Sequence, residues 1–364
     1  MSSTAVRLVP VLGIASLLLA ACAPAPEQGG STGGAGEGTD YCARMVTNSG
    51  GLEDRSFNQA SWAGLEQAAE EFGIAADVLV STSETDLGPN VEQAVGSGCQ
   101  FVLTVGYELT DATLAQAEAN PDIHFSIVDE LADADGDGKP DADNIKPIVF
   151  DTAQASFLAG YLAAGVSKTG VVGTFGGGNQ PPVTLFMDGF VDGVAHFNEV
   201  HGAAVRVLGW DKAAQDGVFT GDFENVNLGK TTTEGLIDQG ADVILPVAGQ
   251  VGEGAAAAAL EAGNVSIIWV DSDGYETLPQ EYRPILLTSV IKNTTDAVVE
   301  IVGVDIDGTF SSEPYIGTLE NGGVGLAPYH DLESLVPAEL AAEIEQLEQD
   351  IISGAITVES PSAP

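Results

Sequence analysis

Short apolar runs alternate with longer amphipathic stretches along most of the chain. The runs have the length of buried strands, and the stretches between them place apolar residues at helical spacing. The strand-like runs cover residues 43–47, 76–80, 101–105, 123–128, 148–150, 171–175, 204–208, 243–247, 266–270 and 285–289. Helix-like stretches such as 58–71 and 111–119 lie between them. This alternation predicts an α/β protein with parallel sheets that helices cover on both faces.

The number of predicted strands exceeds what one sheet holds comfortably, and the chain is long enough for two ordinary domains. We therefore predict two doubly wound lobes, with residues 40–166 and 272–305 in the N-terminal lobe and 167–271 and 306–360 in the C-terminal lobe. Ligands bind such sheets where the carboxyl ends of the strands meet. Glycines at these ends, such as Gly106 and the run 176–178, let backbone approach a ligand closely.

The N-terminus has the layout of a signal peptide over residues 1–21. Arg7 precedes an apolar run over residues 8–19, which is shorter than the roughly 20 residues that span a bilayer. The sequence Leu19-Ala20-Ala21-Cys22 resembles the bacterial lipobox. This resemblance implies a lipid anchor on Cys22, and the alternative is an ordinary secretory signal with an incidental cysteine.

Residues 22–39 are rich in Pro, Gly, Ser and Ala and are expected to form a flexible tether. The whole chain carries a formal net charge of −43, from 54 acidic and 11 basic residues. Nucleic acid is excluded as a partner, because nucleic-acid binding depends on Lys and Arg. Anionic headgroups would repel this body as well, so membrane contact is expected through the lipid anchor only.

The chain has three cysteines, of which Cys22 is assigned to the anchor. Cys42 and Cys99 each lie at the start of a predicted strand, and an exported protein is in a compartment that permits disulfides. We expect a Cys42–Cys99 bridge. Two cysteines without a nearby histidine make a poor zinc site.

One acidic segment, residues 133–144, alternates aspartate with small residues and resembles a calcium-binding loop. The glutamate that closes an EF-hand is missing, and no flanking helix pair is evident. We interpret the segment as a solvated acidic hairpin and expect no metal. A weak calcium candidate remains, formed by Asp133, Asp135, Asp137 and Asp141.

A series of motifs in fixed order resembles the basic membrane protein family of ABC-transporter lipoproteins, whose type member is a purine nucleoside receptor. The first runs from Gly50 to Leu65 and contains Asp54-Arg-Ser56-Phe57-Asn58. The others cover residues 120–129, 156–164, 189–193, 240–244, 270–273 and 288–292. The ordered set spans nearly all of the mature body, whereas a single motif would be weak.

The resemblance implies a type I periplasmic-binding-protein fold, in which three crossovers form a hinge and the ligand binds in the interlobe cleft. It also implies an extracytoplasmic, lipid-anchored component of an ABC importer, which is not an enzyme and needs no cofactor. The expected partners are a purine nucleoside, an ABC permease and its ATPase. We expect the receptor to be a monomer.

Ligand-binding roles are implied for eight positions: Asn48, Ser56, Asn58, Asp129, Phe223, Gly249, Asp271 and Lys292. In this interpretation the Asp129 carboxylate accepts two N–H donors from a purine edge. Asp271 and Lys292 hold ribose hydroxyls through charge-assisted hydrogen bonds, and Phe223 stacks on the base. Ser56 and Asn58 have an alternative role as caps of the helix that begins there.

The sequence departs from the family pattern at Leu52, where an aromatic residue would cover the other face of the base. Trp210 and Phe219, in an apparent insertion before Phe223, are candidates to replace that ring. The departure leaves a second hypothesis open, in which the same fold binds a sugar or another small polar ligand.

Two further alternatives are a sensory binding lipoprotein and a surface hydrolase that acts on nucleosides. The hydrolase is disfavoured, because the four histidines lie in unrelated contexts and no Gly-x-Ser-x-Gly or zinc motif is present.

Overall fold

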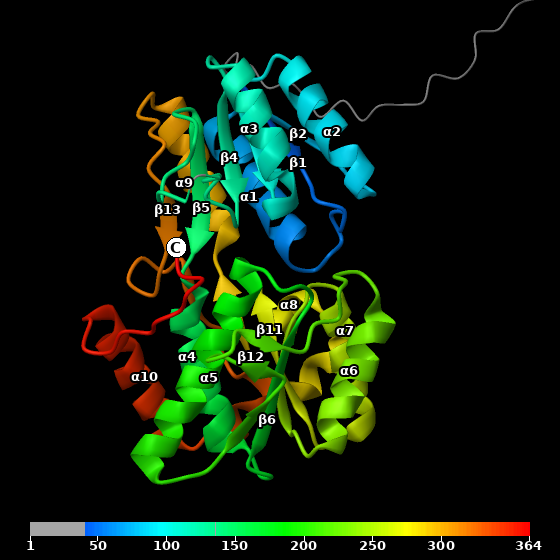
Figure 1. Ribbon diagram of the computed structural model, residues 1–364, viewed down its shortest axis with the longest axis vertical. Helices are drawn as coiled ribbons and strands as arrows, with labels where there is room; N and C mark the ends of the chain where they lie inside the picture. The colour runs from blue at the N-terminus through cyan, green and yellow to red at the C-terminus, as the bar shows by residue number, and fades with distance from the viewer. Residues whose placement is uncertain (1–40, 135) are drawn as a thin grey trace, which may run out of the picture. The chain divides into compact units, whose positions relative to one another are not determined.

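The first of the two six-stranded sheets that the structure describes has parallel strands in the order β13-β5-β4-β3-β1-β2 (Figure 1). We describe residues 41–134 and 136–364 of a computed structural model; the predicted signal peptide, Cys22 and the tether lie outside the described residues. The strands are β1 (Cys42–Val46), β2 (Ala75–Leu79), β3 (Phe101–Val105), β4 (His124–Val128), β5 (Ile145–Phe150) and β13 (Tyr315–Gly317). Strands β3 and β5 are buried along their whole length, as expected for a parallel sheet covered on both faces.

Helices cover both faces of this first sheet. Helix α1 (Phe57–Phe72) packs against α9 (Thr294–Ile306) on one face, with Leu65 and Val298 among the buried side chains. Helix α2 (Glu84–Gly96) packs against α3 (Thr110–Ala119) on the other, with Leu87 and Val91 buried. The short helix η1 (Tyr107–Leu109) follows β3.

The second sheet has the order β14-β12-β11-β10-β6-β7, and only β14 is antiparallel to its neighbour. Its strands are β6 (Val171–Gly176), β7 (Arg206–Leu208), β10 (Val243–Val247), β11 (Ser266–Asp271), β12 (Leu286–Lys292) and β14 (Val324–Leu326). A small ribbon of β8 (Trp210–Asp211) and β9 (Asp216–Gly217) follows β7. The predicted α/β fold with two doubly wound lobes is confirmed.

Two helical layers also cover the second sheet. One layer contains α4 (Thr152–Val166), α5 (Pro181–His201) and α10 (Ala338–Ile352). The other contains α6 (Val226–Asp238) and α7 (Val251–Ala262). The short elements α8 (Gly274–Thr277), η2 (Gln280–Ile285) and η3 (His330–Leu335) lie in the connections.

Helices α4 and α5 approach so closely that their contact requires glycine. A Cβ atom added at Gly193 would lie 1.9 Å from the carbonyl oxygen of Phe157, and one at Gly160 would lie 2.1 Å from that of Phe190. No side chain fits at these distances. Two of the motifs noted in the sequence, residues 156–164 and 189–193, therefore form the packing surface between these helices.

The chain crosses between the sheets three times: after β5, after β12 and between β13 and β14. The lobe boundaries predicted from the sequence are wrong at two strands. Strand β12 belongs to the second sheet, although 272–305 was assigned to the N-terminal lobe, and β13 belongs to the first, although 306–360 was assigned to the C-terminal lobe. Both strands lie directly before a crossover, where sequence patterns carry no mark of which sheet a strand joins.

A disulfide links Cys42 and Cys99, with an S–S distance of 2.09 Å and a Cα–Cα distance of 4.8 Å. The bridge joins the beginnings of the neighbouring strands β1 and β3, whose residues Ala43 and Phe101 are paired in the sheet. It therefore lies at the edge opposite to the carboxyl ends of the strands.

The acidic segment is not a hairpin, because β4 and β5, which it connects, are parallel. The Asp133 carboxylate accepts the backbone N–H groups of Gly136 and Gly138, at 2.7 and 2.6 Å, and Asp141 accepts that of Ala134 at 2.7 Å. Among the residues that the structure describes, no three His, Cys, Asp or Glu side chains could jointly hold a metal ion. Asp135 lies outside the described residues.

No helix within residues 41–134 and 136–364 has both the length and the apolar character needed to cross a membrane.

We predict that the double variant Cys42→Ala, Cys99→Ala has a free energy of unfolding lower by about 2–4 kcal/mol, because the bridge closes a long loop in the unfolded chain. Denaturant titration of the variant beside the oxidised wild type measures this difference. The wild type with reductant present is the control. An unchanged unfolding midpoint in both samples would show that the bridge contributes nothing.

Candidate functional site

A cleft between the lobes lies where the carboxyl ends of both sheets meet. It encloses about 850 Å³, including the part open to solvent, which is in the range for small-molecule sites. Its walls come from both lobes and include seven of the eight predicted positions, Asn58 being the exception. The lining residues are Asn48, Ser49, Gly50, Asp54, Ser56, Phe57, Gly106, Tyr107, Glu108, Asp129, Gln180, Pro182, Val183, Phe186, Phe223, Glu224, Val247, Ala248, Gly249, Gln250, Val270, Asp271 and Lys292.

Two aspartates occupy equivalent places in the two lobes. Strands β4 and β11 are each third in their sheet, and Asp129 directly follows β4 while Asp271 ends β11. Both residues have left-handed backbone, with φ of 65° and 66°. This conformation is uncommon outside glycine and often marks functional sites. The matching geometry places one carboxylate from each lobe in the cleft.

Lys292, the last residue of β12, lies between these carboxylates. Its Nζ is 2.5 Å from Asp129 Oδ2 and 3.5 Å from Asp271 Oδ1. The lysine side chain is only 3% exposed, and the aspartates are 11% and 12% exposed. A buried ammonium needs such partners, because an unpaired charge is costly to remove from water.

Burial and charge act in opposite directions on this cluster. Burial alone would lower the pKa of Lys292, but the carboxylates of Asp129 and Asp271 raise it above its ordinary value. Burial raises the pKa of Asp129, and Lys292 only partly offsets this effect. Two carboxylates share one cation, so Lys292 stays protonated and Asp129 takes up a proton more readily than an exposed aspartate.

The first turn of α1 is capped by Asp54. Its carboxylate accepts the backbone N–H groups of Ser56, Asn58 and Gln59 at 3.1, 2.7 and 3.1 Å. The alternative expectation, that Ser56 and Asn58 cap this helix, is therefore wrong. The Ser56 side chain makes no cap and instead donates its hydroxyl to Asp271 in the other lobe.

Asn58 lies behind the wall of the cleft. It is 1% exposed, and its Nδ2 donates to Asn48 Oδ1 at 2.6 Å. The backbone N–H of Gly50 donates to the same oxygen at 3.1 Å. The structure thus places Asn48 on the wall and Asn58 as its support, because the first turn of α1 directs Asn58 inward.

Phe223 lies on the cleft wall, in the loop before α6. Its ring packs on the backbone of Gly177, where an added Cβ would lie 2.3 Å from the ring. Only glycine at 177 leaves room for the ring at this place. Gly249, with φ of 53°, lies beside the same residue, because a Cβ atom added there would be 3.6 Å from the carbonyl oxygen of Phe223. Both predicted positions therefore belong to one wall.

The residues suggested as a second aromatic cover do not reach the cleft. Trp210 is 6% exposed, and its Nε1 donates to Asp188 at 2.8 Å. Its ring meets Phe219 edge to face, with centroids 5.8 Å apart, and Phe219 packs beside Gly176. Leu52 is also absent from the described lining residues. The prediction for Trp210 and Phe219 is therefore wrong.

Other aromatic side chains line the cleft instead, namely Phe57, Tyr107 and Phe186. The Nζ of Lys292 lies 4.9 Å from the ring centre of Phe57 and 5.7 Å from that of Phe186, which is within cation–π range. Sequence reasoning missed all three. Tyr107 follows the strand-end glycine Gly106 and was detectable from that position, whereas Phe186 looks like any core residue of an apolar helix.

The lobes also meet beside the cleft through Arg55. Its Nε lies 2.9 Å from Glu253 Oε1, and its Nη1 donates to the carbonyl oxygen of Thr277 at 2.9 Å. The hydroxyl of Ser272 donates to the carbonyl oxygen of Arg55 at 3.0 Å. These bonds join the turn before α1 to α7 and to the segment around α8, so the two lobes contact each other in this structure.

A family model described as "ABC transporter substrate-binding protein PnrA-like" matches residues 43–362. Among similar proteins, the "ABC transporter nucleoside-binding protein BmpA" of Lactococcus lactis is 30% identical, over 97% of this chain and 98% of its own. The "CD4+ T-cell-stimulating antigen" of Listeria monocytogenes is 30% identical over 88% of both chains.

Solved structures support the fold. A solute-binding protein of an ABC transporter system from Aeropyrum pernix aligns with a TM-score of 0.77 and 24% identity, over 88% of this chain and 94% of its own. A corresponding protein from Conexibacter woesei aligns with a TM-score of 0.68 and 22% identity, over 89% and 100%. The chain therefore belongs to the Bmp family of PnrA-like ABC transporter substrate-binding proteins.

Proposed function

We propose that this protein is the extracytoplasmic, lipid-anchored receptor of an ABC importer and binds a purine nucleoside between its lobes. The observation that carries the proposal is the cluster of Asp129, Asp271 and Lys292 in the same cleft as Phe223. The cluster offers hydrogen-bonding groups for a base edge and for ribose, and the ring offers a face for the base. The printed name of the Lactococcus lactis relative, a nucleoside-binding protein, agrees with this ligand class.

Each side chain has a proposed role. Phe223 stacks on the base, which contributes about 1–3 kcal/mol for such contacts. Ionised Asp129 accepts N–H donors from the base edge, and Asp271 and Lys292 bind ribose hydroxyls. Because Lys292 contacts both carboxylates, a ligand that hydrogen-bonds to Asp129 competes with Lys292 for its oxygens.

The charge of the cleft favours a neutral nucleoside over a nucleotide. Among the described residues that line it, Lys292 is the only Lys, Arg or His, whereas the acidic side chains are Asp54, Glu108, Asp129, Glu224 and Asp271. A phosphate group would meet repulsion from the carboxylates and has one ammonium to bind, already shared by two of them. We therefore expect discrimination against phosphorylated ligands.

Transport would use closure of the lobes. A ligand that contacts both Asp129 and Asp271 stabilises the closed state by its higher affinity for that state. Contacts such as Arg55–Glu253 would reinforce closure at the edge of the cleft. A permease and ATPase would then recognise the closed receptor, and the anchor at Cys22 with its tether would keep a monomeric receptor near them.

Titration calorimetry with inosine, guanosine and adenosine tests the proposal, with inosine monophosphate, ribose and galactose as comparison ligands. We expect at least one nucleoside to bind, its monophosphate to bind at least tenfold more weakly, and the free sugars not to bind. Chromatography of the incubated nucleosides should detect no cleavage. Binding of a free sugar without any nucleoside would favour the alternative ligand class, and cleavage products would favour a hydrolase.

We predict that acidification weakens nucleoside binding. The weakening should begin at a higher pH than protonation of an ordinary aspartate would cause. The raised pKa of Asp129 means that its accepting carboxylate is present above that pKa and lost as the pH drops through it. Asp129→Asn should bind at least tenfold more weakly at neutral pH and lose this pH dependence. Affinities measured from pH 4 to 8 test both points, with Asp122→Asn, an exposed neighbour before β4, as control. If Asp129→Asn keeps the wild-type pH profile of binding, Asp129 does not bind the ligand.

We also predict that Phe223→Leu weakens nucleoside binding about tenfold or more, because a stacking ring is lost. The melting temperature of the unliganded protein should change little, since Phe223 is only partly buried. Phe310→Leu, which removes a ring that stacks on His124 away from the cleft, is the matched control. Equal affinities of both variants would contradict the stacking role.

A further inference from the structure

A second compartment adjoins the ligand cleft at Asp129. This cavity encloses about 670 Å³, including the part open to solvent. Asp129 and Pro182 line both it and the ligand cleft. Its other walls come from the loop after β4, from β5, from α5 and from the last residues of the chain, namely Glu130, Leu131, Val149, Phe150, Pro181, Leu185, Pro361, Ser362, Ala363 and Pro364.

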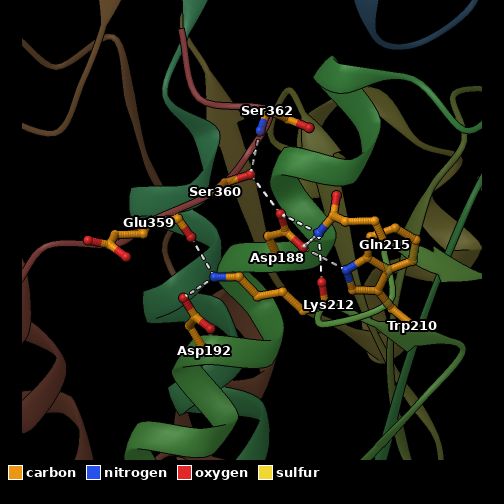
Figure 2. A network of polar contacts seen from close by, with 8 residues as sticks. All are labelled: Asp188, Asp192, Trp210, Lys212, Gln215, Glu359, Ser360 and Ser362. Carbon is orange, nitrogen blue, oxygen red and sulfur yellow. Dashed lines mark hydrogen bonds and ion pairs between the residues drawn. The ribbon is translucent and has the colours of Figure 1, made fainter.

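The C-terminal segment 359–364 is held in place by a polar network (Figure 2). Asp188 on α5 is completely buried and accepts the Ser360 hydroxyl at 2.6 Å, together with Trp210 Nε1 at 2.8 Å and Gln215 Nε2 at 3.0 Å. All of its partners donate, which suits an ionised carboxylate. The segment is therefore bound at a defined place on the second lobe.

Two more contacts fix the direction of this segment. Lys212 Nζ donates to the carbonyl oxygen of Glu359 and also to Asp192 Oδ2, which is 2.6 Å from Nζ (Figure 2). The Ser362 hydroxyl lies 2.8 Å from that of Thr184 near the start of α5. From there Pro361 to Pro364 line the compartment opposite Glu130 and Leu131 of the first lobe. Residues 361–364 thus form one wall of the compartment that Asp129 also lines.

The lining of the compartment defines what it accepts. Leucine, valine, phenylalanine and proline side chains provide most of its described walls, which suits an apolar group. Its charged lining residues are the carboxylates of Asp129 and Glu130, and no described lining residue is a cation. A neutral apolar group fits this environment, and an anionic one does not.

We propose that this compartment is a subsite of the ligand cleft, which takes an uncharged apolar substituent on the base edge that faces Asp129. The inference rests on the proposed function and extends it: the ligand class includes purine nucleosides with substituted exocyclic amino groups. A secondary exocyclic amine can donate its one N–H to Asp129. The other substituent on the same nitrogen would then extend past the carboxylate into the compartment. The C-terminal prolines would cover the substituent.

Titration calorimetry with N6-benzyladenosine and N2-benzylguanosine tests the subsite, each compared with its unsubstituted parent. We expect at least one benzyl derivative to bind within tenfold of its parent. Derivatives with a carboxylate on the same benzyl ring should bind at least tenfold more weakly than the uncharged ones, because they meet Asp129 and Glu130.

The variant Ala363→Trp fills the compartment from the exposed C-terminal segment without disturbing a buried core. It should weaken binding of the benzyl derivative at least tenfold and leave the parent nucleoside within threefold of wild type. Ala355→Trp, the same change at an exposed position outside the compartment, should leave both unchanged.

If the wild-type protein binds the parent nucleosides but neither benzyl derivative, the subsite is overturned and the proposed function still stands. Equal weakening of parent and derivative by Ala363→Trp would overturn it too. Failure of every nucleoside to bind would reject the proposed function, and the subsite with it.

Discussion

The ammonium group of Lys292 is the point on which the site depends. It lies at the end of β12, where the chain leaves the second sheet for α9, and it contacts Asp129 of the first lobe and Asp271 of the second. Removal of either a buried cation or its partner leaves an uncompensated charge, which is strongly destabilising. The same contacts connect the two lobes directly. A ligand that hydrogen-bonds to either carboxylate therefore shares it with Lys292.

The fold was largely predictable because its signals are local. Apolar runs at 101–105 and 243–247 became the wholly buried strands β3 and β10, as the alternation with helices requires. The assignment of β12 and β13 failed because sheet membership is a long-range property. Strand β12 is mainly apolar, like strands of both sheets, and its place is set by pairing with β11 and β14, which no local pattern records.

The site was predictable where chemistry and strand ends coincide. Asp129 and Asp271 stand at the carboxyl ends of strands, and Lys292 is a cation in a chain that has few. The predictions that failed concern the direction in which a side chain points. Asn58 is in the correct motif but points toward Asn48, because helix geometry and the Asp54 cap fix its orientation. Phe57 and Phe186 became cleft residues through packing between distant elements, which sequence spacing does not encode.

The left-handed backbone at Asp129 and Asp271 also limits how this receptor can evolve. Aspartate, asparagine and glycine adopt that conformation far more readily than bulky or β-branched residues do. Single substitutions tolerated at these two positions therefore tend to remove a negative charge while keeping the loop. A change of ligand preference would then come from altered charge and hydrogen bonding on an unaltered backbone, so diverged relatives can share this backbone and recognise chemically different ligands.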